Sequence, residues 1–256
     1  DIPLRLVGSE MCIRDRFTVP YCFSNLNILK GEINLDDNKS AFKADEYDDN
    51  IKRVIPYYED IYAQTADIVN KYVQSAVSWL DVGCGTGKMG SIAFKAADIE
   101  KFAFCDSSSE MIETVKKRFD FPESEFIIAD IRELNYANEF DVVTAIQVNH
   151  YFEWEDRITA VKKCFNALKN GGIFISFENF APYSNIGEKL FLDRWRSYQL
   201  NHGRSRRECE HHIGRYKREY FPITLSEHTN VMKKCGFAYA EIFWVSYMQA
   251  GLLGIK

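Results

Sequence analysis

Three glycines at alternating positions mark the stretch where residue types and spacing most clearly allow chemistry. They are Gly83, Gly85 and Gly87, and they end the run WLDVGCGTG, which begins as a short apolar strand. A helical pattern follows, from Lys88 to about Ala97. Glycines at a strand-to-helix turn let the backbone pass close to a ligand, and the first amides of the helix point towards that ligand. The sequence therefore predicts a nucleotide or nucleoside site.

Three classes of site compete for this turn. A P-loop needs Ser or Thr after Gly-Lys, but Met89 follows Gly87-Lys88 and the spacing differs, which excludes that class. A dinucleotide site needs GxGxxG, which residues 85–90 match, although this motif alone is not specific. The third class is an S-adenosylmethionine (SAM) site, which the acidic Asp81 ahead of the glycines favours.

Acidic residues also end the next two predicted strands. Asp106 follows the strand Lys101–Cys105, about twenty residues after the turn, where a carboxylate can bind both ribose hydroxyls. Asp130 follows the strand Phe126–Ala129, where it can accept the exocyclic amine of adenine while Ile131 packs on the ring face. An NAD enzyme has no general need for this second acid, so the pattern favours SAM.

Five motifs in order carry a family resemblance. They are WLDVGCGTG, FCDSSSEMI, FIIADI, FDVVTAIQVNHYF and LKNGGIFISFE, and the run from Trp79 to Ile255 that contains them resembles a class I SAM-dependent methyltransferase. The resemblance implies an α/β fold with a Rossmann-like, seven-stranded, mostly parallel sheet whose last strand is antiparallel. A helical insertion is expected between strands 5 and 6, at about residues 179–221. The β-rich runs Tyr239–Val245 and Tyr247–Ile255 are expected to form the closing hairpin.

The same motifs supply the predicted cofactor-binding residues. Gly83 and Gly85 are expected to let the methionine portion of SAM approach, and Asp81 to bind its ammonium group directly or to orient the loop. Backbone groups and a side chain after the fourth strand are expected to line the cofactor. With the residues already named, the full set is Arg53, Tyr58, Asp81, Gly83, Cys84, Gly85, Gly87, Asp106, Ser107, Met111, Asp130, Ile131, Ala145 and Gln147.

Arg53 and Tyr58 belong to that set through a narrower resemblance. The pattern Ile51-x-Arg53-x-x-Pro56-x-Tyr58 and the C-terminal tail are similar to the carboxy-SAM synthase branch, which serves a tRNA wobble-uridine pathway. That branch uses an arginine in the insertion to hold a carboxylate of its cofactor. Without gaps this arginine aligns with Ile213, and the nearest arginine is Arg215. A surface arginine and a core tyrosine at helical spacing are the alternative interpretation of Arg53 and Tyr58.

His150 is the candidate catalytic residue. It follows the fourth strand, where a neutral imidazole could take a proton from an acceptor hydroxyl or amine, although a structural histidine is the alternative. The basic run from Arg204 to Arg218 is interpreted as a solvated helix face or as a patch for an anionic acceptor, either a small carboxylate or RNA phosphate. Cys209, His211 and His212 lack a second ligand pair, so no metal site is predicted.

Composition limits the remaining possibilities. The chain has 256 residues and a net charge of −5, so no global basic field favours nucleic acid. Seven cysteines without a CxxC pair indicate reduced thiols and a cytoplasmic protein. No apolar run reaches the roughly eighteen residues of a membrane span. A small-molecule acceptor is expected, with RNA as an alternative acceptor and a homodimer as a possible assembly.

The first residues are expected to lie outside the domain. The run LVGSEMCIRDR back-translates readily onto a transposon adapter used for DNA libraries, so residues 1–16 are interpreted as a disordered, adapter-derived artefact. Residues 17–45 are expected to be a lead-in segment, and residues 46–256 the methyltransferase domain.

One function is therefore predicted from the sequence, and two others are kept as alternatives. The first is a SAM-dependent methyltransferase (EC 2.1.1.-) that acts on an unidentified acceptor. The second is a carboxy-SAM synthase-like enzyme, and the third is a non-catalytic SAM-binding partner subunit.

Overall fold

The structure is a computed structural model that describes residues 42–256. These residues lie within one compact unit, which spans residues 36–256. The predictions for residues 1–16, and for the lead-in segment as far as residue 41, lie outside the described residues.

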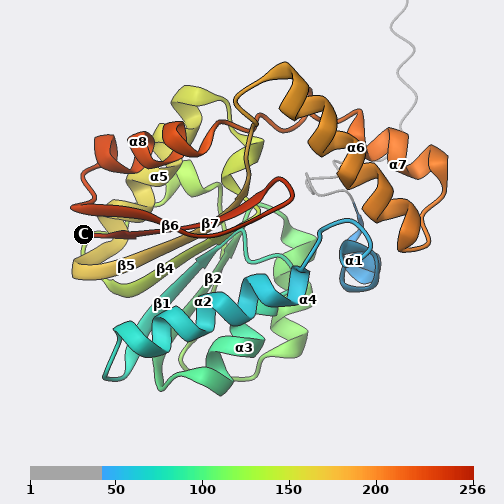
Figure 1. Ribbon diagram of the computed structural model, residues 1–256. Coiled ribbons are helices and arrows are strands. Elements are labelled where there is room, and N and C mark those ends of the chain that lie inside the picture. The colour runs from blue at the N-terminus through green and yellow to red at the C-terminus, as the bar shows by residue number, and fades with distance from the viewer. Residues whose placement is uncertain (1–41) are drawn as a thin grey trace, which may run out of the picture. The chain divides into compact units, whose positions relative to one another are not determined.

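One sheet forms the centre of this unit (Figure 1). Its seven strands are β1 (Val77–Val82), β2 (Ile99–Asp106), β3 (Ser124–Ile128), β4 (Phe140–Ile146), β5 (Leu168–Asn179), β6 (Tyr239–Ser246) and β7 (Gln249–Ile255). Their order is β3-β2-β1-β4-β5-β7-β6. The strands from β3 to β5 are parallel, whereas β7 is antiparallel to both β5 and β6. The predicted sheet, its antiparallel last strand and the closing hairpin are confirmed.

Helices cover both faces of the sheet (Figure 1). Successive side chains on a strand point to opposite faces, so Trp79 and Leu80 belong to two different core clusters. Residues of α2 (Tyr58–Tyr72), α3 (Lys88–Ala96) and α4 (Ser109–Arg118) join the first cluster, and residues of α5 (Trp154–Ala167) and α8 (Leu225–Cys235) join the second. This burial on both faces explains why the strand sequences are nearly continuous apolar runs.

The chain between β5 and α8 forms the helical insertion. It contains α6 (Asn185–Asn201) and α7 (Arg206–Ile213). α7 lies within the basic run from Arg204 to Arg218, and it begins with a capping box between Ser205 and Glu208. The indole Nε1 of Trp195 on α6 donates to the carbonyl of Val54 at 2.6 Å, just after α1 (Ala44–Ile51). The insertion is therefore bonded to the N-terminal part of the described chain.

β5 begins directly after α5. It starts at Leu168, so Asn170, Gly171 and Gly172 lie within the strand. Leu168 pairs with Phe140 of β4, and the register shifts before the next pair, which gives the two glycines room within the strand. Gly171 has a φ of +76°, which glycine adopts at low cost.

No helix within residues 42–256 combines the length and the apolar composition that crossing a membrane requires.

Gly90 on α3 lets the helix approach the aromatic core, which yields a test of the packing. A Cβ on Gly90 would lie 2.4 Å from Cε1 of Phe104, whose ring is fully buried. We expect Gly90→Ala to destabilise the protein by about 1–3 kcal/mol, because overpacking outweighs the roughly 1 kcal/mol gain in helix propensity. Urea unfolding measures this. Phe104→Leu should relieve the clash, so the double variant should lose less stability than the two single variants together. Additive losses in stability would contradict the clash between Gly90→Ala and Phe104.

Candidate functional site

A cavity lies where β1, β2, β4 and β5 end. Parallel sheets bind ligands at this edge, where the chain order switches between neighbouring strands. Elements from the whole described chain line the cavity, from α1 to the end of the insertion. Of the predicted site residues, the lining contains Gly83, Gly85, Asp106, Ser107, Met111, Asp130, Ile131, Gln147 and His150.

The glycine turn after β1 forms one wall. Gly83, Gly85 and Gly87 have φ angles of +65°, +53° and +83°, in the left-handed region that favours glycine. A Cβ on Gly83 would lie 2.3 Å from Cγ2 of Val148, so packing behind the wall also requires a glycine. Within residues 42–256, no atom outside the two neighbouring residues lies within 4 Å of a Cβ built on Gly85. The turn therefore leaves open space for a ligand where a side chain would project.

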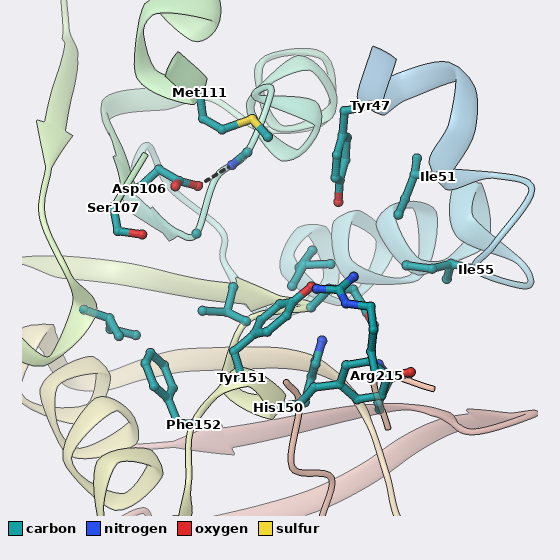
Figure 2. Close-up of a pocket in the computed structure, with 18 of the residues that line it drawn as sticks. Tyr47, Ile51, Ile55, Asp106, Ser107, Met111, His150, Tyr151, Phe152 and Arg215 are labelled. Atoms are coloured by element: carbon teal, nitrogen blue, oxygen red, sulfur yellow. Dashed lines mark hydrogen bonds between the residues drawn. The ribbon is translucent and has the colours of Figure 1, made fainter. Parts of the chain in front are cut away.

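Asp106 joins this turn to the end of β2 (Figure 2). Its Oδ2 accepts a hydrogen bond from the Gly85 amide at 2.9 Å, and its Oδ1 accepts one from the Ser108 amide at 2.9 Å. Ser107 and Met111 line the cavity beside it. The carboxylate is therefore fixed at the cavity wall by backbone donors from two elements.

Asp130 follows β3 and also lines the cavity. Its Oδ1 accepts from the Nε of Arg132 at 2.9 Å, and its Oδ2 accepts from Nη2 at 2.6 Å. This bidentate ion pair fixes the position of the carboxylate. Ile131 next to it is buried and lines the same part of the cavity.

Four predicted residues lie in β1, in the turn after it or in β4 without lining the cavity. Gly87 is the N-cap of α3, and Ala145 is fully buried in β4. Burial raises the pKa of the Cys84 thiol well above its usual range. Asp81 is 2 % exposed and accepts a hydrogen bond from the Thr144 hydroxyl at 2.7 Å. Burial raises the pKa of Asp81 to about 7, although the bond from Thr144 opposes the shift.

Arg53 and Tyr58 lie apart from the cavity lining. Arg53 is exposed, whereas the Tyr58 side chain is 4 % exposed and its hydroxyl lies 3.1 Å from that of Tyr62. This placement matches the alternative that the sequence allowed, a surface arginine and a core tyrosine. Tyr47 lines the cavity instead, and Figure 2 shows its ring extending from α1 on the side opposite Asp106.

Gln147 begins a row of three amides at the ends of β4, β5 and β7. Its Nε2 donates to Oε1 of Gln249 at 2.6 Å, and the Nε2 of Gln249 donates to Oδ1 of Asn179. Gln147 has a φ of +62°, an unusual conformation for a residue other than glycine. Since Gln147 and Asn179 both line the cavity, the row places hydrogen-bonding groups at its floor.

His150 is paired with Glu178, which is fully buried at the end of β5. Nδ1 of His150 lies 3.2 Å from Oε2 of Glu178, and the same carboxylate accepts from the His150 amide, from Asn149 and from Ser176. Burial opposes ionisation of Glu178, but hydrogen bonds from His150 and Ser176 bring its pKa below the usual range. Nε2 of His150 makes no hydrogen bond within residues 42–256.

The far end of the cavity comes from residues that the sequence analysis did not place there. One member of the basic run, Arg215, is 6 % exposed, and its guanidinium lies beside Tyr151 (Figure 2), while its Nε donates to Oε2 of Glu219 at 2.5 Å. Ile213 is buried but does not line the cavity. Three further aromatic residues line this end, namely Trp195, His212 and Tyr220.

Most other arginines of the basic run lie on the surface, whereas Arg204 is half-buried. Arg206, Arg207 and Arg218 are exposed, in agreement with the solvated-face interpretation for these residues. No group of His, Cys, Asp or Glu side chains within residues 42–256 is arranged to hold a metal ion.

Comparisons with known proteins show which proteins this chain is similar to. Residues 80–172 match a family model described as "Methyltransferase domain". A carboxy-S-adenosyl-L-methionine synthase from Helicobacter hepaticus is 25% identical over 229 residues, which cover 86% of this chain and 95% of that protein. A protein of the same name from Nitratiruptor sp. is 28% identical over 211 residues, covering 80% of this chain and 87% of that protein.

Solved structures share the fold. The YcgJ protein of Bacillus subtilis has a TM-score of 0.56 and 14% identity, covering 78% of this chain and 99% of that one. Human N-acetylserotonin methyltransferase, solved in complex with SAM, has a TM-score of 0.53 and 15% identity, covering 82% of this chain and 57% of that one.

The residues at the cavity fit SAM. The open space at Gly85 admits a ligand beside the backbone, and Asp106 and Asp130 present carboxylate oxygens at two successive strand ends. These acceptors suit ribose hydroxyls and the adenine amine, so the cofactor of this domain is SAM.

The buried carboxyl of Asp81 gives a pH-dependent test. Because its pKa rises on folding from 3.8 to about 7, it stabilises the fold fully below its unfolded-state pKa, and this stability is lost as the pH rises through 7. Asn cannot ionise and still accepts from Thr144. We therefore expect Asp81→Asn without SAM to have a higher Tm than the wild type at about pH 8, and a smaller decline of Tm between about pH 4 and 7. A lower Tm than the wild type at about pH 8 would contradict the ionisation of Asp81.

Proposed function

We propose that this chain, which has a class I SAM-dependent methyltransferase domain and resembles the carboxy-SAM synthase branch, transfers the methyl group of SAM to a small-molecule acceptor. One observation carries this proposal. A single cavity extends from the glycine turn, Asp106 and Asp130 to His150 and Arg215. Cofactor-binding groups and groups suited to an acceptor therefore share one space.

The residues at the first end of the cavity would hold SAM. Asp106 would accept hydrogen bonds from the ribose hydroxyls, and Asp130 would accept one from the adenine amine, with Ile131 against the ring. Gly83 and Gly85 would lie beside the methionine portion. When bound, SAM supplies a methyl group that its sulfonium already activates, so the protein contributes mainly positioning and the exclusion of water.

His150 has the geometry of a general base. Its Nδ1 side faces Glu178, which orients the ring, and its Nε2 remains available for a proton from the acceptor. Burial lowers the pKa of His150, although Glu178 opposes the shift, so the imidazole is neutral near pH 7. A neutral imidazole can accept the proton that an acceptor hydroxyl or amine loses as it is methylated.

The side chains around His150 restrict which acceptor fits the cavity. Trp195 and Tyr220 offer aromatic surface, and Arg215 adds a buried positive charge beside Tyr151. A small planar or apolar acceptor with an acidic group fits these walls. Arg215 is enclosed in the cavity, where a small acidic molecule can reach its charge more readily than the phosphates of an RNA, so the arrangement favours a small molecule over RNA.

A specific observation also favours the second function, carboxy-SAM formation. Curated relatives of that name cover most of the chain, and Arg215 reaches the cavity although the ungapped alignment places Ile213 at the arginine position. The guanidinium of Arg215 could hold the carboxylate of such a cofactor in the same place where it would hold an acidic acceptor.

Mass spectrometry of the cofactor that co-purifies separates the two functions. We expect SAM or S-adenosylhomocysteine, whereas a carboxylated species would establish the synthase-like reaction and overturn methyl transfer.

In either case Arg215→Met should lower affinity for the acidic ligand about tenfold or more, since it removes a buried charge–charge contact, and Arg215→Lys should lower it less. Isothermal titration of the identified ligand measures both. The exposed Arg207→Met serves as the matched control.

The base hypothesis predicts a pH profile, once a screen for S-adenosylhomocysteine release has identified the acceptor. We expect kcat of the wild type to rise with pH through a value below 6.5, as His150 loses its proton. Glu178→Gln should move this limb to lower pH, because the carboxylate favours the imidazolium. His150→Ala should lower kcat about 100-fold or more. An unchanged kcat in His150→Ala would contradict the hypothesis that His150 acts as a base. SAM binding without turnover on any acceptor would favour a non-catalytic partner subunit.

A further inference from the structure

α1 forms the side of the cavity that faces the glycine turn and α4. Tyr47 and Ile51 of this helix line the cavity, and Figure 2 shows both on the side opposite Asp106 and Met111. α1 has only eight residues, and its N-cap Lys43 makes no side-chain capping bond. Because so short a helix is unstable by itself, its position over the cavity depends on contacts with other elements.

Asp48 makes the contact between α1 and the glycine turn. Its Oδ1 accepts a hydrogen bond from the Thr86 hydroxyl at 2.6 Å, and its Oδ2 lies 2.7 Å from Nη2 of Arg118 at the end of α4. Nη1 of Arg118 donates to the Thr86 carbonyl at 2.9 Å. Three residues from three elements thus form a closed ring of polar contacts.

The two contacts of Asp48 differ in their surroundings. Thr86 is 1 % exposed, and its hydroxyl donates to a charged oxygen, which makes a strong hydrogen bond. The Arg118 and Asp48 side chains are 40 % and 39 % exposed, so water and salt weaken their ion pair. The bond to Thr86 is therefore the stronger of the two connections.

Thr86 stands between Gly85 and Gly87, in the turn that faces the cofactor. Among the described side chains of α1, Asp48 is the one that hydrogen-bonds to another element. The chain just after α1 is held separately by the insertion, through Trp195 to the Val54 carbonyl and Tyr198 to the Lys52 carbonyl. Asp48 can therefore lose its partner while the connection to α2 stays in place.

We propose that Asp48 is a positioning residue that couples closure of α1 over the cofactor to the conformation of the glycine turn, through its hydrogen bond to Thr86. SAM that orders the turn also fixes the partner of Asp48, and Asp48 in turn holds Tyr47 and Ile51 against the cavity. Because such coupling is reciprocal, loss of the bond shortens the time that SAM stays bound. This inference rests on SAM as cofactor and is independent of the acceptor and of His150.

The dissociation rate of SAM tests the coupling, measured with the full chain by chasing radiolabelled SAM with unlabelled SAM. We expect Asp48→Ala and Thr86→Val each to raise koff about tenfold, which is the loss of one strong hydrogen bond. The double variant should dissociate no faster than the singles, because both remove the same bond. Asp49→Ala is the matched control, since Asp49 lies on the same helix, is exposed and makes no hydrogen bond or ion pair within residues 42–256.

A second readout separates positioning from general stability. Hydrogen exchange of residues 44–51 in the SAM-bound protein should be faster in Asp48→Ala, with the Tm of the apo protein within about two degrees of the wild type. Arg118→Met should raise koff less than Asp48→Ala. A koff in Asp48→Ala equal to that of Asp49→Ala, or additive effects in the double variant, would overturn the proposal. So would a loss of apo Tm with an unchanged koff.

Discussion

The hydrogen bond from the Gly85 amide to the Asp106 carboxylate is the interaction on which the site depends. It forms because Gly85 adopts a left-handed backbone that aims its amide at the end of β2. Asp106 also accepts from Ser108 as α4 begins, so one carboxylate connects the ends of two strands and the start of a helix. The same geometry opens the space at Gly85, so the constraint that builds the turn also makes room for the cofactor.

Two buried carboxyl groups near the cavity, those of Glu178 and Asp81, have opposite pKa shifts. Glu178 stays ionised because its carboxylate collects hydrogen bonds from His150, Asn149 and Ser176. Asp81 has one such donor, from Thr144, and its pKa rises to about 7. Hydrogen bonds from His150 and Ser176 lower the pKa of Glu178 despite its burial, whereas burial outweighs the bond from Thr144 at Asp81. The lowered pKa of Glu178 suits it to orient a base, whereas Asp81 supports the glycine turn.

The acceptor end of the cavity is assembled by long-range contacts. Trp195 on α6 bonds to the carbonyl of Val54, and the Phe221 amide bonds to the carbonyl of His150 at 2.6 Å. These two bonds join the insertion to the segment after α1 and to the turn that carries the base. Arg215 is enclosed, while Arg206, Arg207 and Arg218 of the same basic run are exposed. Enclosure of one arginine among many is what makes it a candidate for binding an acidic group.

The sequence by itself determined the fold class, the glycine turn and the carboxylates at two strand ends, because these features follow from local rules of strand alternation and turn geometry. It could not place Tyr47, Trp195 or Arg215 at the cavity. Helical spacing shows that a face is apolar, but only packing decides whether that face meets a core or a ligand. For the same reason Tyr58 joined the core, and Arg215 differs from the exposed arginines near it through the path of the insertion alone.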